Sequence, residues 1–138
     1  MKISKKTLIN IKILKKIAKI YGFKDVKLNK SLPFHQWAKL NVLDPNKCVY
    51  LNPNFTYKEY RKYYSYKIKP SQLFLFTLLH EIGHYVLKHF YEEMSMPFYK
   101  NAKNHKDIHR NWVKLRKKQE KEAWQWAHRE LTKYNKFK

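Results

Sequence analysis

Two histidines and a glutamate near the middle of the chain have the spacing of half a metal site. In the segment His80-Glu81-Ile82-Gly83-His84, the histidines stand at positions i and i+4. On an α-helix such side chains lie on the same face, so both imidazoles can bind one metal ion. Glu81 can then reach a water bound to that metal and act as a general base. The pattern indicates a metal-dependent hydrolase.

The residues around this motif predict a buried helix. Apolar residues dominate both the segment that leads into the motif and the segment that leads out of it. Pro70 and Ser71 supply a helix start, and nothing breaks the pattern before Pro97, so we expect one helix over about 71–91. Burial of ionisable side chains is costly unless they are paired or bound to metal. This favours a metal site over a hydrogen-bonded pair of core histidines.

The composition restricts the ligands that such a metal can have. A length of 138 residues gives one domain with a modest core, and 43% hydrophobic residues argue for a folded chain. The single cysteine, Cys48, excludes an internal disulfide and a Cys/His cluster, and it fits a reducing compartment. Histidine and carboxylate groups must therefore hold the metal.

The charge of the chain is strongly positive, with 31 Lys and Arg against 10 Asp and Glu, or +21. Such a charge attracts polyanions, but the lysines are spread along the whole sequence and no nucleic-acid-binding signature accompanies them. We expect a solvated surface with non-specific affinity for nucleic acid.

No signal peptide or membrane span is expected, because lysines interrupt the N-terminal apolar residues and the apolar stretch before His80 is short. The expected location is cytoplasmic, and the oligomeric state stays open.

The remaining segments predict a small α+β domain in which a short three-stranded sheet packs beside helices. An amphipathic helix over residues 3–20 ends at Gly22. Its apolar stripe would consist of Ile9, Ile13, Ile17 and Ile20. Strands are expected at 25–28, 34–40 and 48–51, with a turn at 44–47, a short helix or lid at 57–66, a loop at 94–108 and a final helix at 112–134. Residues 1–138 then form one domain: N-terminal helix (1–22), small sheet (23–56), motif helix (71–91) and C-terminal helix (112–134).

A catalytic zinc ion usually has three protein ligands, so a third ligand must follow His84. The candidates in the sequence are His89, Glu92, Glu93, His105, Asp107, His109, Glu120, Glu122, His128 and Glu130. The first three lie on or just past the motif helix and are expected to project away from the metal. His105 and His109 have wholly polar surroundings.

The final helix separates the remaining candidates. Its apolar stripe would carry Glu120 together with Ala123, Trp124, Ala127 and Leu131. Glu122 is about 200° away around the helix. A carboxylate on the core-facing stripe can meet the histidine pair, so we expect Glu120 to be the third ligand, with Glu122 as the alternative.

Two segments resemble the ImmA/IrrE-type zinc metallopeptidases. Residues 76–89, Phe-Thr-Leu-Leu-His-Glu-Ile-Gly-His-Tyr-Val-Leu-Lys-His, are similar to their active-site helix, and residues 120–131 resemble their second motif, E-x-E-A-(N/D)-x-F-A-x-x-L. The strand at 49–53 also lies where such domains place one. The related E-x-x-x-D pattern of the soluble minigluzincins and the HtpX-type membrane peptidases implies that the first glutamate, here Glu120, binds zinc.

The resemblance implies a gluzincin-type peptidase acting on a protein or peptide, such as a cytoplasmic regulator or repressor. His80, His84 and Glu120 would hold Zn²⁺, and Glu81 would be the catalytic base. The residue that would stabilise the oxyanion is left open among His109, His128, Tyr85 and a tyrosine from 57–66.

The chain departs from the family pattern at Trp124, where those families have Asn or Asp. An Asn or Asp side chain can orient a ligand imidazole by accepting its N–H, but tryptophan offers only an N–H donor. Two alternatives are a basic nucleic-acid-associated protein with a structural zinc and an inactive minigluzincin scaffold.

Overall fold

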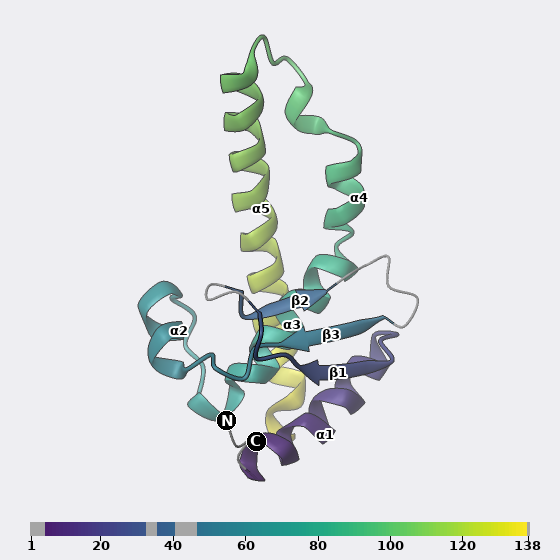
Figure 1. Cartoon of the computed structure of the whole chain (residues 1–138), viewed down its shortest axis with the longest axis vertical. Coiled ribbons are helices and arrows are strands. Elements are labelled where there is room, and N and C mark those ends of the chain that lie inside the picture. Colours follow the sequence, from purple (N-terminus) through teal and green to yellow (C-terminus); the bar gives the residue numbers. More distant parts are fainter. Residues whose placement is uncertain (1–4, 33–35, 41–46, 138) are drawn as a thin grey trace.

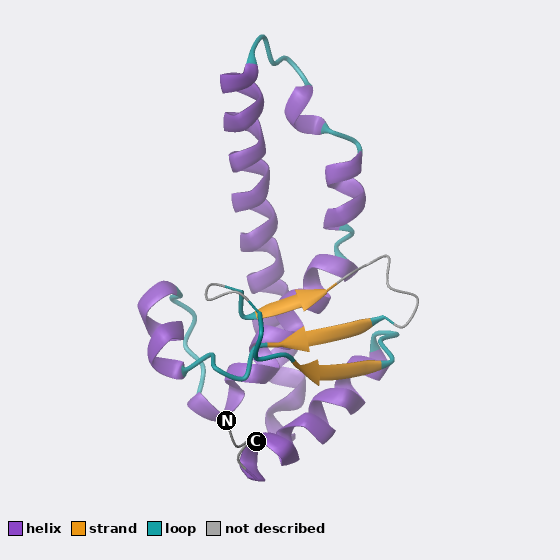
Figure 2. Ribbon diagram, viewed as in Figure 1, coloured by secondary structure: helices purple, strands orange, loops and turns teal. Residues whose placement is uncertain are grey.

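The computed structural model describes residues 5–32, 36–40 and 47–137, and they form a single small α+β domain, as predicted. A three-stranded sheet lies against helices on one side, and a pair of helical segments extends away from it (Figures 1 and 2). The elements are α1 (Lys5–Ile20), β1 (Asp25–Leu28), β2 (Ala38–Leu40), β3 (Cys48–Leu51), α2 (Tyr57–Tyr63), α3 (Leu73–Val86), α4 (His89–Met94) and α5 (His105–Leu131). Short 3-10 turns cover Pro70–Gln72, Pro97–Tyr99 and Thr132–Phe137.

The sheet has the strand order β1-β3-β2, so β2 is an outer strand. β1 pairs parallel with β3, with Val26 opposite Val49, and β2 pairs antiparallel with it, with Lys39 opposite Tyr50. The predicted strands at 25–28 and 48–51 are confirmed, whereas β2 begins only at Ala38. Residues 34–35 of the expected strand and 44–46 of the expected turn lie outside the described residues.

Helix α1 ends as predicted, but its buried face is rotated from the expected stripe. Ile17 is buried, while Ile20 is 68% exposed; Leu14 and Ala18 take the buried positions instead. Gly22 adopts a φ of 92°, a left-handed conformation that glycine reaches without steric cost. The backbone N–H of Phe23 then bonds to the carbonyl of Ala18 and closes the helix end.

The motif helix is shorter than predicted. α3 ends at Val86, and Lys88 takes a φ of 58°, so the chain turns sharply before α4 begins at His89. No glycine or proline marks this break, which is why the sequence pattern suggested one helix over 71–91.

The final helix begins earlier than predicted, at His105 instead of about 112. Asn104 caps it, because its side chain accepts a hydrogen bond from the backbone N–H of Asp107 at 3.0 Å. Together with the turn at Pro97–Tyr99, this replaces much of the loop expected at 94–108.

We call residues 89–116 the arm; they comprise α4, that turn and the first part of α5, and they extend away from the sheet in Figure 1. The arm carries exposed apolar side chains: Tyr91, Met94, Met96, Tyr99 and Trp112.

The close packing of α3 against α5 depends on Gly83. A Cβ atom at this position would lie 3.2 Å from the carbonyl oxygen of Ala123 and 3.1 Å from the ring of Trp126. Both distances are shorter than ordinary van der Waals contact. The missing side chain of Gly83 therefore lets the two helices approach at the level of the motif histidines.

Replacing Gly83 with valine is expected to lower the free energy of unfolding by about 1–3 kcal/mol, because the larger side chain must displace the backbone at Ala123. Alanine should cost less, since its gain in helix propensity, about 1 kcal/mol, offsets part of the clash. Thermal denaturation of Gly83→Ala, Gly83→Val and the parent measures this order. A valine variant as stable as the parent would contradict the close approach.

Candidate metal centre

The three predicted ligands converge between α3 and α5. The Nε2 atom of His80 lies 2.8 Å from Oε2 of Glu120, and Nε2 of His84 lies 3.1 Å from Oε1 of the same carboxylate. The two Nε2 atoms are 3.1 Å apart. Ligands about 2.0–2.1 Å from a tetrahedral zinc ion are separated by roughly 3.3 Å, so this triangle is close to one face of such a site. In the part of the chain that the structure describes, this is the one group found that could hold a metal ion.

The two histidines hold the carboxyl group of this triangle in its ionised form. Burial acts to raise the pKa of Glu120, but hydrogen bonds with His80 and His84 and their charges outweigh it, so the pKa lies well below its usual value. Glu120 is therefore an ionised carboxylate that faces two imidazole nitrogens. This donor set of two nitrogens and one carboxylate suits a borderline cation such as Zn²⁺.

Trp124 holds the imidazole of His80 by stacking. The two rings lie 3.8 Å apart with an interplanar angle of 10°. Trp124 is itself buried and packs against Phe76 and Tyr64, with ring centroids 4.8 Å away in each case. Trp124 stands at the position where the resembled families have Asn or Asp. It restricts the orientation of the His80 imidazole by covering one face of that ring. The other nitrogen of His80, Nδ1, lies 3.5 Å from Oε1 of Glu81.

Glu81 lies beside the triangle, in the position predicted for a general base. Burial raises the pKa of the Glu81 carboxyl above its usual value, and this effect exceeds the lowering of the pKa by His80 and His84. A carboxylate whose pKa is shifted toward neutrality is better able to accept and then return a proton.

The triangle opens into a cleft of about 550 Å³. Its walls come from α3, α5, the outer strand β2 and the segment after α2. The lining residues are Gln36, Trp37, Ala38, Lys39, Leu40, Tyr64, Thr77, His80, Glu81, His84, Arg116, Glu120 and Trp124. A carboxylate, a histidine pair and a strand edge thus share one cavity.

Sequence reasoning missed Arg116 as a residue of this cleft. Its guanidinium lies 2.9 Å from Glu93 and 3.9 Å from Oε1 of Glu120. The sequence contained one indication of this, because Arg116 stands one helical turn before Glu120. The contact of Arg116 with Glu93 could not be predicted, because it depends on how the arm folds.

Of the residues left open for oxyanion stabilisation, the cleft contains Tyr64, which belongs to the predicted 57–66 segment. Burial and the charge of Glu120 raise its pKa, so its hydroxyl stays a proton donor. Tyr85 instead packs against Phe23. His109 is exposed on the arm and His128 borders a different hollow.

Two further candidates, His89 and Glu122, form a pair behind His84. Nδ1 of His89 lies 2.7 Å from Nδ1 of His84, and its Nε2 lies 3.2 Å from Oε1 of Glu122. His89 lies outside the triangle, as expected, but the break at Lys88 folds it back onto the motif helix, where it contacts His84. Glu122, the alternative third ligand, contacts His89 and is not part of the triangle.

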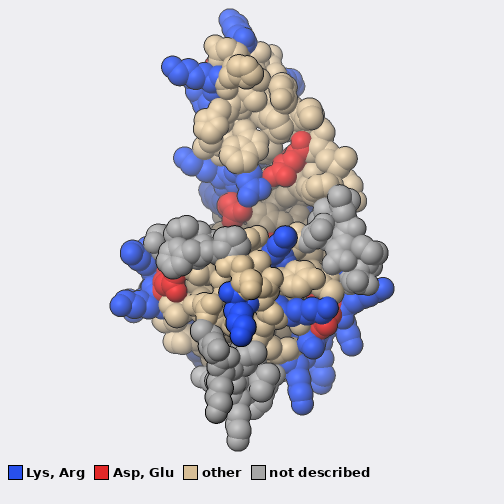
Figure 3. All heavy atoms as spheres, in the orientation of Figure 1, with Lys and Arg blue, Asp and Glu red and all other residues tan. Residues whose placement is uncertain are grey.

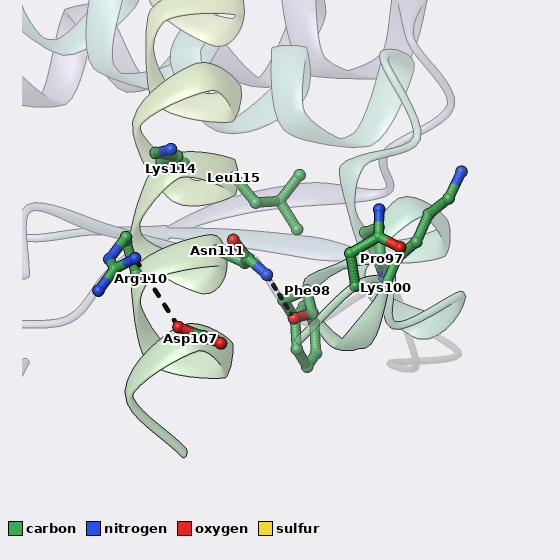
Figure 4. A pocket seen from close by; sticks show the side chains of 9 residues that line it. Pro97, Phe98, Lys100, Asp107, Arg110, Asn111, Lys114 and Leu115 are labelled. Carbon is green, nitrogen blue, oxygen red and sulfur yellow. Dashed lines mark hydrogen bonds and ion pairs between the residues drawn. The ribbon is translucent and has the colours of Figure 1, made fainter. Parts of the chain in front are cut away.

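A second hollow of about 550 Å³ lies within the arm, away from these groups (Figure 4). The Asn111 side chain donates to the carbonyl of Phe98 across it, and Arg110 lies 3.7 Å from Asp107. Among the described residues that line it, Asp107 is the only carboxylate and none is a histidine.

Lysine and arginine side chains appear on both the arm and the sheet-bearing part of the face shown in Figure 3. This distribution agrees with the spread of lysines in the sequence and marks out no single basic site. Among the described helices, none has the length and apolar character needed to cross a membrane.

No protein-family model, curated protein or solved structure matches the chain.

Proposed function

We propose that this protein is a zinc-dependent peptidase of the gluzincin type. The observation that supports this most directly is the convergence of His80, His84 and Glu120, from two helices, within hydrogen-bonding distance of one another. Two histidines and one carboxylate are the protein ligands of several zinc peptidases, which leave a fourth position for water. The resemblance of residues 76–89 and 120–131 to the ImmA/IrrE-type peptidases supports the same assignment.

The residues around the triangle have the properties that peptide hydrolysis requires. Zinc held there would lower the pKa of its water and polarise the scissile carbonyl. Glu81 takes the proton from the attacking water and delivers it to the leaving amine. Tyr64 and Arg116 lie in the same cleft and can donate hydrogen bonds to the developing oxyanion.

Strand β2 provides a way to align a substrate. It is an outer strand of the sheet, and residues 36–40 line the cleft. An extended peptide can pair with an exposed strand edge through its backbone, which holds it straight across a neighbouring site. We therefore propose an unfolded or extended protein segment as the substrate, in keeping with a regulatory protein such as a repressor.

Glu120→Ala is expected to lower the affinity for zinc by about 100-fold or more, because the substitution removes one of the three proposed ligands. Competition with a chromophoric chelator measures the affinity. Glu130→Gln, a substitution of a half-buried carboxylate further along the same helix, is the matched control and should bind zinc as the parent does. Equal affinity in Glu120→Ala and the parent would remove Glu120 from the ligand set.

The catalytic assignment predicts that Glu81→Gln keeps stoichiometric zinc but loses cleavage of an unstructured, fluorescently quenched peptide pool by about 10²–10⁴-fold. The glutamine keeps the size and shape of the side chain and one acceptor oxygen while removing its basicity. If the zinc-loaded parent cleaves nothing and binds nucleic acid equally well with and without zinc, the peptidase proposal fails and the basic binding protein is favoured.

A further inference from the structure

The side of His84 that faces away from the triangle is occupied by a chain of hydrogen-bonding groups. The Nε2 atom of His84 points to His80 and Glu120, so its Nδ1 atom points in the opposite direction. There it meets Nδ1 of His89 at 2.7 Å, and Nε2 of His89 meets Oε1 of Glu122 at 3.2 Å. Both rings and the carboxylate thus form one continuous path from α3 through α4 to α5.

We propose that His89 and Glu122 are positioning residues that fix the tautomer and orientation of the metal-binding imidazole of His84. This inference rests on the proposed metal site. Residues of this kind act on the metal through its ligand and do not touch it themselves.

The hydrogen-bond roles follow from the chemistry of imidazole. A ring whose Nε2 lone pair faces a metal must carry its proton on Nδ1. His84 therefore donates from Nδ1 to Nδ1 of His89, which must be an acceptor. His89 then carries its own proton on Nε2 and donates it to Glu122, which is acceptor-only when ionised. This assignment of protons satisfies both contacts behind His84 and leaves the Nε2 lone pair of His84 for a metal ion.

The fold holds His89 firmly in this position. Its side chain is buried, and its backbone carbonyl accepts a hydrogen bond at 3.2 Å from the amide of Gln119. Gln119 is fully buried and also donates to Glu92 of α4 at 3.0 Å. The left-handed conformation of Lys88 is what brings His89 back toward α3. Helix α5 thus supplies Glu120 to the triangle, and Gln119 and Glu122 to the residue behind it.

His89→Phe tests the proposal because phenylalanine fills the buried space but cannot accept a hydrogen bond. We expect zinc affinity to fall by about 10- to 100-fold. His89→Gln, whose amide oxygen can accept from His84, should recover most of the loss. His109→Phe, at an exposed histidine of the arm, is the matched control and should bind zinc as the parent does.

The tautomers can be read directly in the zinc-loaded protein, in which the metal would take the place of any proton on Nε2 of His84. Long-range ¹H–¹⁵N NMR spectra of the zinc-loaded parent should show His84 protonated on Nδ1 and His89 protonated on Nε2. Glu122→Ala, at a half-exposed position that leaves the core intact, should give mixed tautomers at His89 and a smaller loss of zinc affinity than His89→Phe. The zinc affinities separate the two proposals: a parent that binds no zinc would overturn the metal site itself, whereas a parent that binds zinc no more tightly than His89→Phe would overturn only the positioning role.

The proposal is overturned if His89 in the zinc-loaded parent is protonated on Nδ1, because it could not then accept the hydrogen bond from His84. It is also overturned if His89→Phe binds zinc as tightly as the parent.

Discussion

The close contact between α3 and α5 at Gly83 and Ala123 is the constraint on which the rest of the molecule depends. Because a Cβ at Gly83 would lie 3.2 Å from the Ala123 carbonyl, any side chain at this position would force the two helices to shift apart. With glycine there, the histidines one turn apart on α3 can reach a carboxylate on α5. The packing of the two helices brings the three donor groups together, and the stacking of Trp124 on His80 and the contact of His89 with His84 restrict their orientation.

The tryptophan on α5 shows a different physical solution to the orientation of a ligand. An Asn or Asp orients an imidazole by accepting its N–H, whereas Trp124 covers the face of the His80 ring at 3.8 Å. Stacking fixes the plane of the ring but leaves its edge free, so Nδ1 of His80 stays near Glu81. The aromatic cluster behind Trp124 makes that plane rigid, since the indole is held between Phe76 and Tyr64.

Local sequence patterns predicted the parts of the site that depend on one helix at a time. The i, i+4 spacing of the histidines and the apolar stripe of the last helix led to the same three residues that the structure brings together. The break at Lys88 had no such pattern, because lysine carries no conformational preference for a left-handed turn. The position of His89 therefore could not be predicted, and neither could the cleft residue Arg116, since both depend on how the arm folds back along α5.

The central claim is that His80, His84 and Glu120 together bind one zinc ion. Anomalous diffraction at the zinc edge from crystals of the zinc-loaded protein tests it most directly. The account predicts one fully occupied peak at about 2.0–2.2 Å from Nε2 of both histidines and from an oxygen of Glu120. A peak on other residues, or none at the α3–α5 contact, would contradict it.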